Sequence, residues 1–80
     1  MRLDKFLKVS RLIKRRTVAK DFAEHERVLL NGRVAKPAAE VRPGDIITIR
    51  FGDRQHVVEV LDIKETVRAG DAHALYRVLE

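Results

Sequence analysis

The sequence predicts an α+β fold in which two short N-terminal helices pack on one side of a small, curved, mostly antiparallel sheet. Two observations support this fold. Apolar residues follow a helical spacing as far as about Glu26, and after Val28 the chain changes to short β-branched runs separated by turn residues. Because the chain has 80 residues and no cysteine, we expect one domain, near the lower size at which a hydrophobic core alone suffices.

The first helix is predicted from Leu3 to about Val9. Leu3, Phe6 and Leu7 lie at positions i, i+3 and i+4 and therefore share one face, while basic side chains occupy the opposite face. If the helix continued, the next apolar residues would fall on the basic face. We therefore predict an interruption near Ser10, whose side chain competes for local backbone hydrogen bonds.

The second helix is predicted to begin at Thr17, an acceptable N-cap, and to end at about His25. The basic residues that separate it from the first helix are expected to stay exposed. Its apolar face is expected to contain Val18, Ala19, Phe22 and Ala23.

Turn residues divide the second half of the chain into strands. Asn31-Gly32 predicts a two-residue hairpin, because both central positions of such a turn need a positive φ. Pro43-Gly44 fits a type II turn before a strand at Ile46–Phe51, and Gly52-Asp53 connects that strand to the next one.

The C-terminal part, residues 55–80, is expected to add two more strands. One runs from about His56 to Ile63, a polar loop follows at Glu65–His73, and Ala74–Leu79 forms a last strand. The core is then expected to contain Leu3, Phe6, Leu7, Leu12, Ile13, Val18, Phe22, Val28, Leu30, Val34, Ile47, Ile49 and Val58.

Positive charge is concentrated at the start of the chain. Residues 1–20 hold eight of the 17 Lys and Arg residues but only one of the 12 acids, Asp4. The rest of the chain has a small excess of acids. A surface polarised in this way is the electrostatic footprint of a protein that binds a polyanion.

Catalysis, metal binding and membrane insertion have little support in the sequence. The chain has no cysteine nucleophile and no phosphate-cradling glycine loop, and its three histidines are far apart. No apolar run approaches the roughly 20 residues that span a bilayer, and the N-terminus lacks the apolar stretch of a signal peptide. We therefore expect a non-catalytic, cytoplasmic, monomeric protein without cofactor, metal or membrane contact.

Nucleic acid is the polyanion that these residue types fit best. Arginine clamps phosphate with a planar fork, and lysine adds a mobile point charge. Because Phe6 and Phe22 are expected in the core, recognition of RNA backbone shape is favoured over stacking of unpaired bases. A DNA-binding helix-turn-helix is the rival, but strands begin where that motif needs its third helix.

Four segments, in this order, resemble the S-four RNA-binding domain. The similarity covers about residues 2–50 and implies the alpha-L RNA-binding motif within a single domain of residues 1–80. The segments are Arg-Leu-Asp-Lys-Phe-Leu at 2–7, Lys-Arg-Arg-Thr-Val-Ala-Lys at 14–20, Val-Leu-Leu-Asn-Gly-Arg-Val-Ala-Lys-Pro at 28–37 and Val-Arg-Pro-Gly-Asp at 41–45.

Within that domain family, the chain most resembles the RqcP family of ribosome-associated quality control and the related fifteen-kilodalton heat-shock proteins. The latter usually carry a basic C-terminal extension, which this sequence lacks. The resemblance implies binding to large-subunit rRNA and peptidyl-tRNA on stalled large ribosomal subunits. There the family supports alanine tailing of nascent chains by a NEMF-type (RqcH-like) partner.

Carried over position by position, the resemblance implies nine RNA-binding residues. The roles of two residues stay open. Asp4 either orients a basic neighbour or is a first-turn acid favoured by the helix dipole. Asn31 either forms the turn or contacts RNA. The nine residues are Arg2, Lys5, Lys8, Arg11, Arg15, Arg16, Lys20, Asn31 and Lys36.

Two further functions remain as alternatives. The chain could be the RNA-recognition subunit of an RNA-modifying enzyme. It could also be a chaperone-like interaction protein that binds peptide along the exposed edge of the strand at Ala74–Leu79, because an unpaired edge can accept an added strand.

Overall fold

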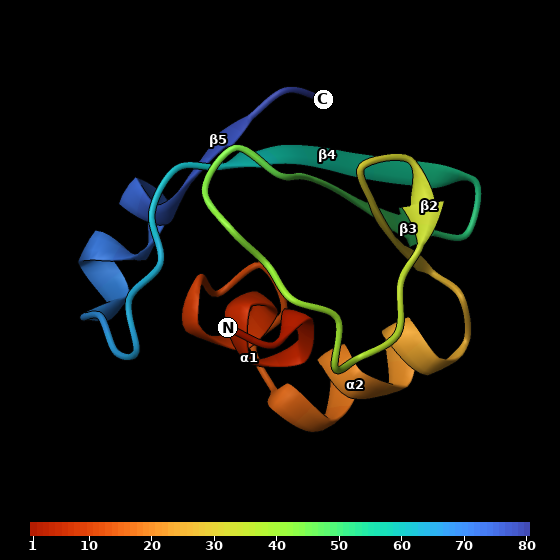
Figure 1. Cartoon of the computed structure of the whole chain (residues 1–80), viewed down its shortest axis with the longest axis horizontal. Helices are drawn as coiled ribbons and strands as arrows, with labels where there is room; N and C mark the ends of the chain where they lie inside the picture. The colour runs from red at the N-terminus through yellow and green to blue at the C-terminus, as the bar shows by residue number, and fades with distance from the viewer.

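A five-stranded antiparallel sheet of order β2-β1-β3-β4-β5 carries both α-helices on one face (Figure 1). The computed structural model describes residues 1–80, and the α+β architecture predicted above is confirmed. The elements are α1 Leu3–Val9, α2 Arg16–Glu24, β1 Val28–Leu30, β2 Arg33–Val34, β3 Ile46–Phe51, β4 Arg54–Val60, a 3-10 helix η1 at Ala69–Leu75, and β5 Tyr76–Val78.

The predicted interruption after the first helix is confirmed. The Ser10 N–H still donates to the Phe6 carbonyl, 2.9 Å away, and the Ser10 hydroxyl donates to the Leu7 carbonyl at 3.2 Å. The next residue, Arg11, has a φ of +64°, a left-handed conformation that no helix continues through. The chain therefore turns back on itself, and Ile13 returns to the core.

The second helix begins at Arg16 rather than at Thr17, so the predicted N-cap is wrong. Arg15 occupies the N-cap position in extended conformation, and its carbonyl accepts the first helical bond from Ala19. Arg15 offers no capping hydrogen bond from its side chain. The first N–H groups of α2 therefore lack a side-chain acceptor, which leaves the positive end of the helix open.

Small residues, rather than large ones, form the buried face of α2. Ala19 and Ala23 are fully buried, and they let α2 pack close to α1. Val18 was expected in the core, but 41% of it is exposed, because the buried stripe is centred on the alanines and Val18 lies to one side. Phe22 is half-buried, on the same flank as Val18.

The Asn31-Gly32 hairpin is confirmed, with φ values of +53° and +82° and Leu30 paired with Arg33. The Asn31 side chain also joins the hairpin to β3. Its oxygen accepts from the Ile46 N–H at 2.8 Å, and its amide donates to Asp45 at 3.1 Å. These bonds give Asn31 a structural role.

Replacing Asn31 by alanine is expected to lower the free energy of unfolding by about 1–3 kcal/mol. The substitution removes two hydrogen bonds and places a Cβ-bearing residue without a polar side chain at positive φ. Urea unfolding followed by circular dichroism measures the loss. Asn31→Gly also removes the two hydrogen bonds, but glycine adopts a positive φ without strain, so this variant measures the contribution of the hydrogen bonds alone. If both variants were as stable as the wild type, Asn31 would have no structural role.

Val34 was also expected in the core, and this expectation is wrong. It pairs with Leu29, whose neighbours on both sides, Val28 and Leu30, face the helices. Because side chains alternate along a strand, Val34 lies on the uncovered face at the sheet edge, where 47% of it is exposed.

The C-terminal elements differ from the prediction at their ends. β4 ends at Val60 rather than near Ile63, and the expected loop contains the 3-10 helix η1. Ala74 and Leu75, predicted to begin the last strand, belong to that helix. Buried Leu75 anchors it, and the Leu75 carbonyl accepts from the Leu61 N–H at 2.8 Å.

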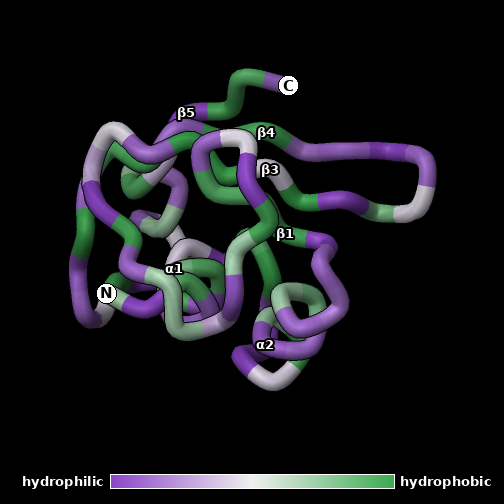
Figure 2. The backbone as a smooth tube through the Cα atoms, turned by 45° about the vertical axis from the view of Figure 1, so that its right-hand side comes forward, coloured by the Kyte–Doolittle hydropathy of each residue, from purple (hydrophilic) through white to green (hydrophobic).

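The core lies between α1 and the inner face of the sheet. Phe6, Leu3 and Leu7 of α1 are fully buried against inward-facing residues of the central strands. In Figure 2 apolar residues, in green, alternate with hydrophilic ones along α1 and predominate in the part of β4 near its label, whereas the far end of the β3–β4 hairpin is largely hydrophilic. The sheet residues in this core are Val28, Ile47, Ile49, Val58 and Val60.

Candidate nucleic-acid interface

A buried carboxylate, Asp4, holds two arginines from different elements. Only 2% of Asp4 is exposed. Arg2, just before α1, donates from Nε and Nη2 to the two carboxylate oxygens at 3.1 and 3.2 Å. Arg16, the first residue of α2, donates from Nη2 at 3.4 Å. Both arginine side chains are about half exposed (50% and 48%), so the outer parts of their guanidinium groups face solvent.

The environment of Asp4 favours its charged form. Burial raises the pKa of the carboxyl group. The hydrogen bond from Arg2 and the charges of Arg16 and Arg2 together lower the pKa by more than burial raises it, so the pKa lies below the ordinary value of 3.8. Asp4 is therefore ionised at neutral pH. Of the two readings left open by the sequence, the structure supports the one in which Asp4 orients basic neighbours.

Backbone contacts with a distant segment fix the position of Arg2. The N–H groups of Leu3 and Asp4 donate to the carbonyls of Ala39 and Pro37, at 2.9 and 3.1 Å, and Arg2 forms an isolated bridge with Glu40. In Figure 1 this segment, between β2 and β3, descends from the sheet towards α2 and then passes beside α1 on its way back to the sheet. No residue pattern in this segment predicts the contact, because it joins parts of the chain that are distant in sequence.

These side chains line a shallow hollow that has no apolar residue in its wall. Its volume is about 290 Å³. Lys20 lies one helical turn after Arg16, and Thr17, which the sequence analysis did not place in the site, adds a hydroxyl. The uncapped N-terminus of α2 lies at the same end. The lining residues are Arg2, Asp4, Arg16, Thr17 and Lys20.

A second basic group lies on the solvent face of α1. Lys5 forms an ion pair with Glu65, and the hydrogen bond and charge of Lys5 lower the pKa of Glu65. Arg11 Nη2 lies 3.5 Å from the Val67 carbonyl. Lys8 is exposed between these two contacts. The loop after β4 thus lies against this face, which the sequence analysis did not foresee.

The remaining predicted site residues do not join either group through their side chains. Arg15 is exposed at the start of α2. Lys36 is exposed and directly precedes Pro37, so its backbone lies beside the first turn of α1. Asn31 is bonded to the β3 segment, as described above.

The hollow presents cationic hydrogen-bond donors from Arg2, Arg16 and Lys20. No cluster of three or more potential ligand side chains is placed to hold a metal ion. None of the helices combines the length and apolar composition needed to cross a membrane. The guanidinium, ammonium and backbone N–H groups of this surface can bind anions.

Comparison with known proteins identifies the family. The model of the S4 domain matches residues 1–47. The chain belongs to the S4 domain family. The resemblance predicted from the four ordered segments is thereby confirmed. The matched range contains α1, α2, the β1–β2 hairpin and the basic residues of both groups, but not the loop after β4 that contacts the second group.

Within the S4 domain family, the similarity extends over nearly the whole chain. The RQC P-site tRNA stabilizing factor of Halalkalibacterium halodurans is 56% identical over 98% of this chain and 89% of its own length. The factor of the same name from Bacillus subtilis is 50% identical over 100% of this chain and 93% of its own length. The chain therefore belongs to the same family as these factors.

The fold is also shared with a heat-shock relative. The structure of Heat Shock Protein 15 from Vibrio cholerae, described as trimeric, superimposes with a TM-score of 0.89 at 37% identity. The match covers 98% of this chain and 80% of that protein. Both relatives named by the sequence analysis are thus confirmed as relatives.

Proposed function

We propose that this protein is a non-catalytic RNA-binding factor of ribosome-associated quality control. It binds large-subunit rRNA and peptidyl-tRNA on stalled large ribosomal subunits, acts in the cytoplasm as a monomer, and supports alanine tailing by a NEMF-type (RqcH-like) factor on the same subunit. The names of its relatives, which describe P-site tRNA stabilising factors, support this assignment.

The observation that carries the proposal is the pair of arginines held on one buried carboxylate. Arg2 and Arg16 each have five N–H donors, and Asp4 uses only a minority of them. The remaining donors, already oriented, are available to phosphate oxygens, with Lys20 beside them. Holding them in place before binding reduces the side-chain entropy lost when RNA binds.

The other basic residues extend this surface. Such contacts are made to the phosphate backbone, and they position the protein on a folded RNA rather than read its sequence. We assign Asn31 to the fold and not to the interface. The proposed RNA-binding residues are Arg2, Lys5, Lys8, Arg11, Arg15, Arg16, Thr17, Lys20 and Lys36.

The salt dependence of binding tests the proposal. If five to eight phosphates are neutralised, the logarithm of the affinity for purified large subunits should fall with the logarithm of salt concentration at a slope of roughly −4 to −7. Fluorescence anisotropy of labelled protein measures this slope, with and without peptidyl-tRNA on the subunit.

The control is Arg77→Gln, which removes a charge that pairs with Glu59 in the β4–β5 pair, away from both basic groups. It should leave the slope unchanged. An affinity that is independent of salt would exclude the phosphate contacts, and equal affinity for empty and tRNA-bearing subunits would exclude the tRNA contact.

A further inference from the structure

An exposed aromatic side chain lies at the end of the β3–β4 hairpin. Phe51 is 43% exposed, and its ring packs against that of Phe22 on α2, with ring centroids 5.5 Å apart and an interplanar angle of 56°. Of the two aromatic residues expected in the core, Phe6 is fully buried and Phe22 is half-buried. An aromatic ring of this exposure, supported from one side by a second ring, was not anticipated.

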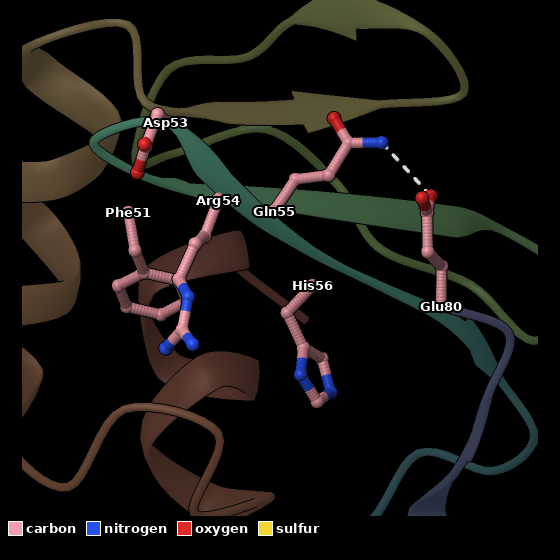
Figure 3. Close-up of a pocket in the computed structure, with 6 residues that line it drawn as sticks. All are labelled: Phe51, Asp53, Arg54, Gln55, His56 and Glu80. Atoms are coloured by element: carbon pink, nitrogen blue, oxygen red, sulfur yellow. Dashed lines mark hydrogen bonds between the residues drawn. The ribbon is translucent and has the colours of Figure 1, made fainter.

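Phe51 forms one wall of an open hollow of about 640 Å³. Arg54 is its cross-strand partner and therefore lies on the same face of the sheet. Figure 3 shows Phe51, Arg54 and His56 on one side of the hairpin, whereas Gln55 projects to the other side and bonds to Glu80.

The residues around the ring are polar and carry both signs of charge: Arg54 is the cation of the hollow, and Asp53 and Glu80 are its acids. The Arg27 guanidinium lies 5.4 Å from the centroid of Phe22, a cation–π geometry, and Arg54 lies beside Phe51. His56 Nε2 is the one buried side-chain nitrogen or oxygen without a hydrogen-bond partner. Phe51 is the single apolar residue that lines the hollow.

This hollow adjoins the helix that carries the proposed phosphate contacts. Phe22 follows Arg16 by six residues on α2, a rise of roughly 9 Å along the helix axis. An RNA strand that follows α2 from Arg16 to Phe22 would reach Phe51, because Phe51 packs against Phe22.

We propose that Phe51 is a stacking platform for one unpaired RNA base, with Arg54 contacting the adjoining phosphate. The inference rests on the proposed RNA-binding function. An aromatic residue that is 43% exposed among polar and charged groups suits a base, which has apolar faces and polar edges. An apolar peptide side chain would find a single apolar residue in the wall, which is too little surface to bury it.

The experiment compares two short RNA stems that differ by one single-nucleotide bulge, in which the unpaired base is 2-aminopurine. Wild-type protein, Phe51→Leu and Phe51→Tyr are titrated against both stems at low salt. Stacking on an aromatic ring quenches 2-aminopurine fluorescence. Leu79→Ala, a change at another exposed apolar residue, is the matched control. Thermal unfolding verifies that each variant is folded.

We expect Phe51→Leu to weaken binding of the bulged stem by about 5- to 100-fold and to abolish quenching, while binding of the paired stem is unchanged. Phe51→Tyr should behave like wild type. Quenching and discrimination that persist in Phe51→Leu, or equal losses on both stems, would overturn the platform. If wild-type protein bound neither stem nor large subunits, the proposed function itself would fail.

Discussion

Replacing Arg2 and Arg16 together by alanine is expected to reduce the affinity for large ribosomal subunits by about 100-fold or more. Each arginine supplies a charge-assisted contact to phosphate, and one hydrogen bond to a charged group contributes about 1.5–3 kcal/mol. Since about 1.4 kcal/mol corresponds to a factor of ten, the two together exceed two orders of magnitude. Cosedimentation with large subunits, and anisotropy titration at fixed salt, measure the change.

The matched control is Arg15→Ala, which removes the same charge from an exposed arginine that has no carboxylate partner. It should cost much less affinity. A second comparison, Arg2→Lys with Arg16→Lys, keeps the charge but loses the planar fork, and should give an intermediate affinity. If the double alanine variant bound like Arg15→Ala, the pair on Asp4 would have no special role.

Asp4→Asn is expected to lower the free energy of unfolding by about 1.5–3 kcal/mol near neutral pH, the range for hydrogen bonds to a charged group. The variant keeps the shape of the side chain but removes the charge that both arginines face. It should also weaken RNA binding, because Arg2 and Arg16 lose the group that orients them.

The effect of Asp4→Asn has a defined dependence on pH. The pKa of Asp4 in the folded protein lies below its ordinary value of 3.8, so the stabilisation is present above that value and is lost as the pH falls through the folded pKa. The difference between wild type and variant should be constant near neutral pH and shrink below about pH 3.8. A difference unchanged down to pH 2 would contradict the ionised state of Asp4.

Local patterns were sufficient to predict most of the fold. The apolar spacing of Leu3, Phe6 and Leu7 fixed the buried face of α1, and Asn31-Gly32 predicted the hairpin, because both depend on residues close in sequence. The errors at Val18 and Val34 depend on which neighbour an element meets. Periodicity alone does not say that α2 packs on its alanines or that one sheet face stays uncovered.

The candidate site was predicted by residue type but not by geometry. Charge density indicated the basic residues, yet it could not distinguish the arginines on Asp4 from Lys5, which is paired with Glu65 far along the chain. Phe51 was missed because an aromatic residue near a strand end is compatible with core or surface. The exposure of Phe51 depends on how much of its ring α2 covers, and this is decided only when the helix packs against the hairpin.

The attachment of Arg2 to the segment at 37–41 has a consequence for the order of events during synthesis. The basic residues of α1 and α2 are translated first, but the N–H groups of Leu3 and Asp4, which follow Arg2, find their acceptors only when Pro37 and Ala39 have also left the ribosomal tunnel. Until then the nascent chain has its positive charge, but the segment that positions Arg2 and Asp4 is not yet in place. The proposed interface is therefore completed at a late stage of translation, when the earliest and later parts of the chain first meet.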